Sequence, residues 1–213
     1  MRRFLTVAAA AATLATIGAP AQAAIIFSGD HSVTVNQAEP GLVLQTQEMA
    51  ATLNFALDLG ETETISLFKL YTLEGSVNPD DLAPKPITLG FTFTLPEVFG
   101  GSIGGTTVGD YFYGVLDKGV VTWANGGSQT FNFGNGGQLL VDLDDAIFNE
   151  ATFWELYSDL HPGKGSAAKI KADFTLMQLP SAVPEPATWA MMISGFGLAG
   201  SALRRRREAA VFA

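Results

Sequence analysis

The chain of 213 residues contains no cysteine, and it has no arginine between residues 4 and 203. Without cysteine there is no disulfide framework, no thiolate metal site and no cysteine nucleophile. A chain of this size can still bury enough apolar surface to fold without disulfides. Arginine occurs only at positions 2, 3 and 204–207, so residues 24–183 rely on six lysines for positive charge.

The central part is strongly acidic. Residues 24–183 carry 19 aspartates and glutamates against those six lysines, a net charge of −13. Nucleic acids and anionic lipid heads should be repelled, because binding to them depends on Lys and Arg. We therefore expect no nucleic-acid partner. The charge would attract Ca²⁺ or a basic partner, although solubility alone also explains it.

Histidine is almost missing as well. The two histidines, His31 and His161, are expected to be solvated surface residues. No Gly-x-Ser-x-Gly elbow accompanies them, and there is no His-Glu-x-x-His spacing for zinc. We predict that the protein is not an enzyme and needs no cofactor. The alternative is a glycoside hydrolase, which requires only two carboxylates at a set separation across a cleft.

The first 23 residues have the three parts of a secretory signal peptide. Arg2 and Arg3 form a positive start, Phe4–Ile17 is apolar, and Ala21 and Ala23 form a small-x-small cleavage site. Cleavage would leave Ala24 as the first mature residue and implies export through the Sec machinery.

Two-residue hydrophobic alternation predicts that residues 24–180 form one all-β domain. The alternation is clear in the ranges 51–59, 89–95 and 170–176. The range 62–73 is rich in β-branched and aromatic residues, and 139–143 is also predicted to be a strand. Each range would place one face on a core and the other in water, as in antiparallel sheets. Short strands separated by Gly, Pro and Asn turns favour a β-sandwich, and we predict a jelly-roll-like one.

Glycine and asparagine supply the predicted connections. Two Asn-Gly-Gly triplets, at 125–127 and 135–137, predict a three-stranded meander over residues 120–143. The glycine-rich segment 99–109 is expected to be a mobile loop without a phosphate-binding role. Residues 144–160 are expected to be either a short helix or a strand followed by a loop.

Two acidic clusters are weak candidates for Ca²⁺, a cation that prefers oxygen ligands. One is Asn78, Asp80 and Asp81, and the other is Asp142, Asp144 and Asp145. We favour ordinary solvated turns as the explanation of both clusters, because Asn, Asp and Pro are common turn residues.

Aromatic side chains offer a glycan-binding alternative, because exposed rings can stack on sugars. The candidates are Tyr111, Phe112, Tyr113, Trp123 and Trp154. Burial in the core is the commoner fate of large rings.

The C-terminal segment 181–213 has a separate organisation. Pro184, Glu185 and Pro186 hold an extended, non-helical peptide. Residues 187–203 are uncharged, so a helix of about 25 Å would reach the lower limit for a transmembrane span. The four arginines that follow would stop transfer on the cytoplasmic side, and Trp189 would lie at the outer interface. These stop-transfer residues are Arg204, Arg205, Arg206 and Arg207.

This order of Pro-Glu-Pro, Trp-Ala, an apolar span and an arginine cluster resembles the PEP-CTERM sorting signal. The resemblance covers about 25 residues. It implies recognition by exosortase, a protease of the inner membrane of Gram-negative bacteria, and a link to exopolysaccharide and biofilm. The precursor would be anchored in the inner membrane with its body in the periplasm, and the mature protein would reach the cell surface or extracellular matrix.

Taken together, these features predict an exported, non-enzymatic protein with a structural, adhesive or glycan-associated role. An enzyme acting on polysaccharide and a Ca²⁺-dependent binding module are the two alternatives.

Overall fold

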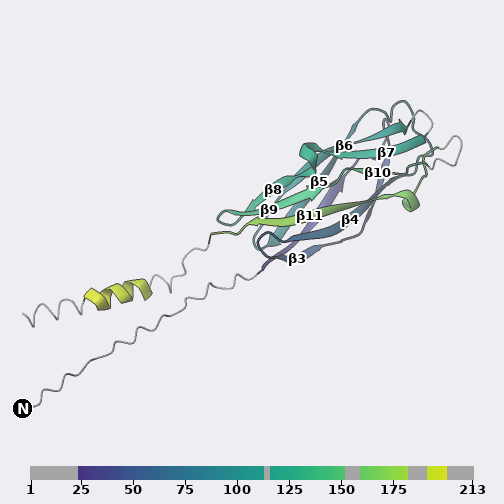
Figure 1. Cartoon of the computed structure of the whole chain (residues 1–213). Helices are drawn as coiled ribbons and strands as arrows, with labels where there is room; N and C mark the ends of the chain where they lie inside the picture. Colours follow the sequence, from purple (N-terminus) through teal and green to yellow (C-terminus); the bar gives the residue numbers. More distant parts are fainter. Residues whose placement is uncertain (1–23, 113–115, 152–158, 182–190, 201–213) are drawn as a thin grey trace, which may run out of the picture.

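The computed structural model describes residues 24–112, 116–151, 159–181 and 191–200 (Figure 1). The predicted signal peptide lies outside these residues. The described strands are β1 (Ile25–Thr34), β2 (Leu44–Glu48), β3 (Leu53–Leu57), β4 (Thr62–Thr72), β5 (Lys85–Leu95), β6 (Phe99–Phe112), β7 (Leu116–Trp123), β8 (Gln129–Phe133), β9 (Gly137–Leu143), β10 (Ala146–Phe148) and β11 (Ala168–Gln178). Two 3₁₀ turns, η1 (Ala124–Gly127) and η2 (Lys164–Ser166), interrupt them.

The strands form two antiparallel sheets packed face to face. The first sheet has the order β10-β7-β6-β5-β1-β3 and the second has the order β2-β4-β11-β9-β8. The chain alternates between the sheets from β1 to β5, and then β5, β6 and β7 follow one another within the first sheet. The prediction of an all-β antiparallel sandwich is confirmed.

Alternating burial explains why these segments form strands. In β11 every second residue from Ala168 to Leu176 is buried, and β3 shows the same period. Phenylalanine rings join the two layers: Phe55 of the first sheet lies 4.8 Å from Phe174 of the second, centroid to centroid. Phe27 and Phe133 make a similar contact at 5.4 Å. Each fully buried ring contributes about 1.5–3 kcal/mol to stability.

The glycine-rich segment is a strand, so the prediction of a mobile loop was wrong. Residues 99–109 belong to β6, which pairs with β5 on one side and β7 on the other. A Cβ atom on Gly101 would lie 2.5 Å from the Phe131 ring, and one on Gly105 would lie 2.6 Å from the Thr122 carbonyl oxygen. These glycines therefore allow close approach within a strand rather than a turn.

The predicted three-stranded meander is also wrong in its first half. The triplet 135–137 closes the β8–β9 hairpin as expected, with Phe133 opposite Gly137. The triplet 125–127 instead lies in η1, where three successive positive φ angles carry the chain from the first sheet to the second. A hairpin was not available there, because β7 already pairs with β6 and β10 along its two edges.

The sequence left two alternatives open for residues 144–160. Ala146–Phe148 forms strand β10, and Asn149–Ala151 is not helical, so the described part of 144–160 follows the strand-and-loop alternative. Residues 152–158 lie outside the described part.

In the tail, residues 191–200 are helical, while the rest of the predicted span 187–203 lies outside the described residues. Within the described part, no helix combines the length and the apolar character needed to cross a membrane.

Candidate functional site

The chain enters and leaves the sandwich at the same end. The start of β1 and the end of β11 lie together there, because Ile25 pairs with Leu57 and the Gly60 N–H donates to the Leu176 carbonyl oxygen at 2.8 Å. We call this the proximal end (Figure 1). Ser181 is held there by a hydrogen bond from its backbone N–H to the Asn135 carbonyl oxygen, 2.8 Å, in the β8–β9 turn. The opposite, distal end contains the end of β6, the start of β7 and the loop between β4 and β5 (Figure 1).

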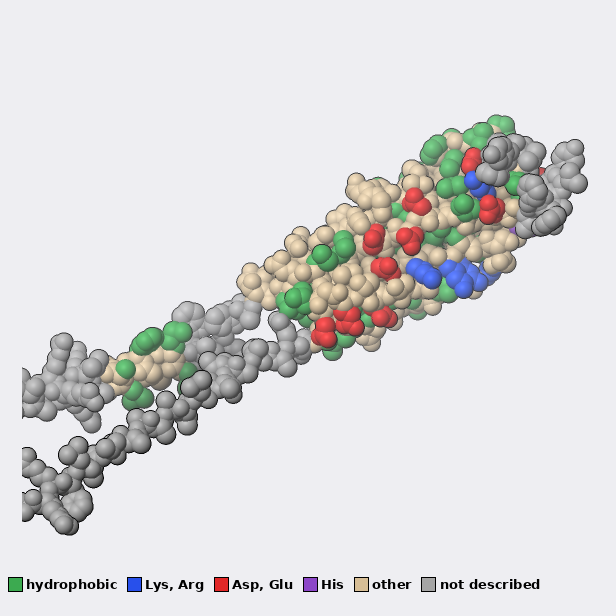
Figure 2. Space-filling view, viewed as in Figure 1, with side chains coloured by type: hydrophobic (Ala, Val, Ile, Leu, Met, Phe, Trp, Pro, Cys, Tyr) green, Lys and Arg blue, Asp and Glu red, His purple; other side chains and the backbone are tan. Residues whose placement is uncertain are grey.

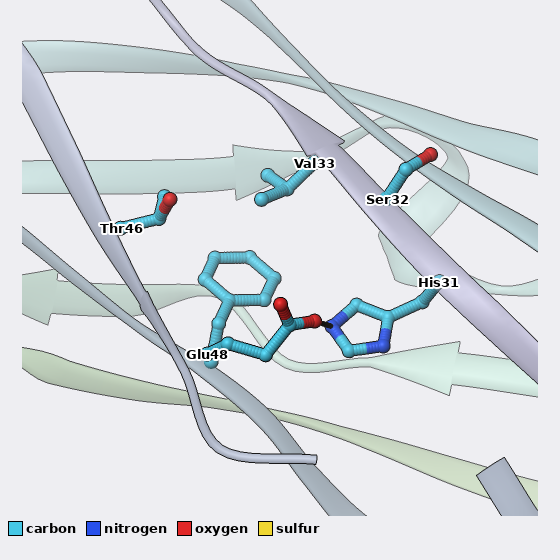
Figure 3. Close-up of a pocket in the computed structure, with 6 residues that line it drawn as sticks. His31, Ser32, Val33, Thr46 and Glu48 are labelled. Carbon is cyan, nitrogen blue, oxygen red and sulfur yellow. Dashed lines mark ion pairs between the residues drawn. The ribbon is translucent and has the colours of Figure 1, made fainter. Parts of the chain in front are cut away.

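A groove opens along one side of the sandwich, between the two sheets (Figure 3). Strand β1 pairs with β3 only as far as Gly29, so residues 30–34 have a free edge there, and β2 is the edge strand of the second sheet. The groove has a volume of about 490 Å³ and is lined by His31, Ser32, Val33, Thr46, Glu48 and Phe68.

His31 lies in this groove with its side chain only 1% exposed, so the prediction of a solvated histidine was wrong. Its Nε2 lies 3.4 Å from Glu48 Oε1, and its ring stacks on Phe68 at 6.3 Å between centroids. Burial lowers the pKa of His31, and the negative charges of Glu48 and Asp30 partly oppose that shift. The Nδ1 atom is buried without a hydrogen-bond partner.

The groove does not assemble a serine nucleophile. Ser32 follows His31 in the same strand, and successive side chains of a strand point to opposite faces. Figure 3 shows the Ser32 hydroxyl pointing away from the imidazole. The other histidine, His161, is half-buried in the loop before η2, where its backbone N–H donates to the Asn149 carbonyl oxygen at 3.0 Å.

The candidate Ca²⁺ residues at the end of β9 point to different partners. Asp142 and Asp144 line a shallow depression of about 190 Å³ with Thr64, Lys171 and Asp173. Asp142 Oδ1 accepts a hydrogen bond from the Ser128 hydroxyl at 2.9 Å. Asp145 instead accepts the backbone N–H of Trp123 at 2.7 Å, which makes it part of the η1 turn.

The other acidic cluster is brought together at the distal end, with a residue from a third position. Carboxylate oxygens of Glu39, Asp80 and Asp81 lie within 4.8 Å of one another. A hydrogen bond to the Asp80 carboxylate raises the pKa of Glu39, and the backbone N–H of Gly41 lowers the pKa of Asp80. Asn78 contributes its backbone N–H to Asp81 Oδ2 at 2.7 Å.

Glu74 is the fourth acid at this end, and sequence reasoning missed both it and Glu39. Burial is the main cause that raises the pKa of Glu74, and the nearby Asp81 and Glu39 charges raise it further. Neither residue belongs to an acidic run, and Glu39 precedes Asp80 by 41 positions. Only the folded arrangement of the two loops brings these carboxylates together.

Among the candidate glycan-stacking residues, Trp123 is buried in the core, and its indole N–H donates to the Asp144 carbonyl oxygen at 3.1 Å. Tyr113 and Trp154 lie outside the described residues, as do the side chains of Tyr111 and Phe112. The exposed large apolar side chains in the described part of the sandwich are aliphatic.

Charge on the outer face of the second sheet is uneven. Three of the six lysines, Lys69, Lys169 and Lys171, lie together on β4 and β11, where Lys69 is directly opposite Lys169. We call these three the lysine cluster. Figure 2 shows a group of basic side chains on this view, with acidic side chains directly beside it.

The fold and its termini define a class: an acidic two-sheet β domain joined to a C-terminal targeting segment. The comparison with protein families identifies that segment, because residues 182–207 match the PEP-CTERM protein-sorting motif. The motif marks the chain as an exosortase substrate, and therefore as an exported, cell-surface-associated protein. Pro184, Glu185, Pro186, Trp189 and Arg204–Arg207 all fall within the match, and the predicted resemblance is confirmed. No curated protein and no solved structure matched the chain.

Proposed function

We propose that the β-sandwich is a non-enzymatic structural or adhesive component of extracellular material, associated with exopolysaccharide and linked to biofilm formation. The sorting motif at residues 182–207 is the observation that carries this proposal. The position of Ser181 supports it, because this residue is bound at the proximal end of the sandwich. A precursor held by its tail would face the membrane with the proximal end and present the distal end outward.

The lysine cluster is the part of the described surface that suits an acidic polysaccharide. Lys69 and Lys169 lie directly opposite each other on neighbouring strands, and Lys171 borders the depression that Asp142, Asp144 and Asp173 line. Attraction between the lysine cluster and polymer carboxylates is electrostatic, and salt would weaken it. This interaction would hold the protein in the matrix without any chemical reaction.

The geometry of the acidic cluster argues against the glycosidase alternative. A retaining enzyme needs its two carboxyl groups about 5–5.5 Å apart across the scissile bond, and an inverting enzyme needs more. Carboxylate oxygens of Glu39 and Asp80 instead lie within 4.8 Å of each other, which is closer than either separation. The groove beside His31 contains Glu48 as its one carboxylate.

Delivery is tested by replacing Pro184, Glu185 and Pro186 with alanine in the full chain. The expected result is uncut precursor in the inner membrane and loss of the protein from the extracellular fraction. An Asp142→Asn variant, changed on the sandwich alone, should be processed normally. Mature extracellular protein that still contains Arg204–Arg207 in mass spectrometry would refute processing at this motif.

The role of the body is tested separately, with the chain that is processed correctly. Deleting the gene should reduce the protein and polysaccharide retained in the matrix, and the wild-type chain should restore both. A variant with Lys69, Lys169 and Lys171 changed to glutamine should reach the surface but wash out at lower salt. Unchanged retention of this variant would refute the role of the lysine cluster, and an unaltered matrix in the deletion strain would refute the structural role.

A further inference from the structure

Three backbone N–H groups at the distal end each bind one oxygen of a carboxylate. Gly41 donates to Asp80 Oδ2 at 3.0 Å, Val43 donates to Glu74 Oε1, and Asn78 donates to Asp81 Oδ2. Each carboxylate is therefore fixed in orientation by one of its oxygens. The donors come from two separate loops, 39–43 and 74–81.

The second oxygens of two of these carboxylates are buried without a partner. Glu74 Oε2 and Asp81 Oδ1 have no hydrogen-bond donor, and Asp81 is 0% exposed. An ionised carboxylate only accepts hydrogen bonds, so two such oxygens cannot satisfy each other. Leaving them unpaired is costly, because a buried charge requires a partner. The site therefore requires either bound protons or a cation.

Positive charge from the protein is limited here. The Lys85 side chain packs beneath Gly41, and its ammonium group helps to lower the pKa of Asp80. One lysine does not balance the four carboxylates of Glu39, Glu74, Asp80 and Asp81. Of the salt bridges found among the described residues, neither involves any of these four acids.

We propose that Glu39, Asp80 and Asp81 bind a calcium ion at the distal end of the sandwich, with Glu74 beside it as a supporting carboxylate. Ca²⁺ binds oxygen ligands at about 2.3–2.6 Å, so two ligands of one ion lie up to about 5 Å apart. The separations of up to 4.8 Å between the three carboxylates fit this requirement. An all-oxygen set rich in carboxylate suits calcium better than zinc or copper.

The ion would join elements that are distant in the sequence. The Asp81 backbone is bound to β6, because the Gly109 N–H donates to the Asp81 carbonyl oxygen at 2.9 Å. The same loop is bound to β7, because the Val77 N–H donates to Asp117 Oδ2 at 2.7 Å. Calcium would therefore fasten loops 39–43 and 74–81 to the first sheet and stiffen the end that faces outward. This role goes beyond the proposed matrix association and does not depend on it.

The test is thermal unfolding of the full chain, purified in detergent, in EDTA and in millimolar CaCl₂. Extracellular calcium modules bind with dissociation constants of about 10⁻⁴–10⁻³ M. Saturation by millimolar calcium should therefore raise Tm by about 3–6 °C. Magnesium should raise Tm less, because it requires a near-ideal octahedral site.

Variants distinguish calcium binding at this site from nonspecific screening of the acidic surface by calcium. Glu39→Gln and Asp80→Asn alter exposed side chains, so both variants should fold and lose the calcium shift. The matched control is Asp142→Asn with Asp144→Asn, which removes two charges from the other acidic cluster and should retain the shift. Isothermal titration with CaCl₂ should give one site in the wild type and none in Glu39→Gln.

Three outcomes would overturn the proposal. The first is a Tm that calcium does not change, which would mean that protons alone satisfy the carboxylates. The second is a calcium shift that survives both Glu39→Gln and Asp80→Asn. The third is an equal loss of the shift in the control variant, which would show that calcium only screens the surface. None of these results depends on processing or matrix retention, so the proposal can fail independently of the proposed function.

Discussion

His31 and Glu48 connect the two sheets across the side groove, with Nε2 and Oε1 3.4 Å apart (Figure 3). His31 belongs to β1 of the first sheet and Glu48 to β2 at the edge of the second. One partner is buried and the other is 57% exposed. The histidine therefore experiences both desolvation, which opposes its charge, and an acidic neighbour, which favours it.

The first prediction concerns stability against pH. Burial lowers the folded-state pKa of His31 from its ordinary value of 6.5, so the folded protein binds fewer protons than the unfolded chain in that range. Stability should therefore be highest above pH 6.5 and should fall as the pH drops below it towards the lowered pKa. Urea unfolding between about pH 5 and 8 measures this dependence. His31→Phe should flatten it.

The contribution of Glu48 can be measured directly. Glu48 raises the pKa of His31 against the larger effect of burial. In Glu48→Gln, the NMR titration midpoint of His31 should therefore move to lower pH. A midpoint that moves upward, or remains where it was, would mean that the ion pair does not form in solution.

The second prediction uses two neighbouring glycines of β6. A Cβ on Gly105 would lie 2.6 Å from the Thr122 carbonyl oxygen and 3.0 Å from the Trp123 ring, whereas one on Gly104 would meet nothing within 4 Å. Gly105→Ala should therefore cost about 1–3 kcal/mol of unfolding free energy through overpacking. Gly104→Ala should change stability by less than about 0.5 kcal/mol. Equal effects of the two substitutions in urea unfolding would contradict the β6–β7 pairing.

The third prediction concerns Asn149, a buried residue with φ of 50°. Its Oδ1 accepts the Thr72 N–H at 2.8 Å, and its Nδ2 donates to the His161 and Gly163 carbonyl oxygens. Asn149→Ala would remove all three bonds and place alanine in an unfavourable backbone region. We expect a loss of about 2–4 kcal/mol in the free energy of unfolding.

The control for this substitution is Asn132→Ala in β8. Asn132 is exposed and makes one weak contact, with Gln138 at 3.4 Å. Its replacement should shift stability by less than about 0.5 kcal/mol. If Asn149→Ala is equally mild, the loop around His161 is not held by this side chain.

The sequence predicted those parts of the fold that depend on local alternation. The strand in 170–176 could be recognised because one face is apolar and the other polar, and it forms the middle of β11. Glycines were misread in β6, because a glycine needed for close packing looks the same in sequence as one needed for a turn. The packing of Phe131 against Gly101 joins strands that are 30 residues apart and has no local signal.

The candidate sites differ in the same respect: residues that are contiguous in the chain could be recognised, and residues that only the fold brings together could not. The sorting motif was recognisable because its parts are contiguous in the chain. Asp80 and Asp81 were noticed as neighbours, but Glu39 and Glu74 come close to them only through the fold. Burial of His31 could not be inferred either, because it depends on Phe68 and on the position of β2.

The last prediction separates a structural aspartate from a metal ligand. Asp145 accepts the Trp123 N–H at 2.7 Å, beside the bond from the Trp123 indole to the Asp144 carbonyl oxygen. Asp145→Ala would leave that backbone N–H without its partner at the point where the chain crosses between the sheets. We expect a loss of about 1–3 kcal/mol, equal in EDTA and in calcium. Asp145→Asn retains an acceptor oxygen and should lose less. If Asp145→Ala instead abolished a calcium-dependent rise in Tm, calcium would bind at the end of β9, and the assignment of the ion to the distal end would have to be withdrawn.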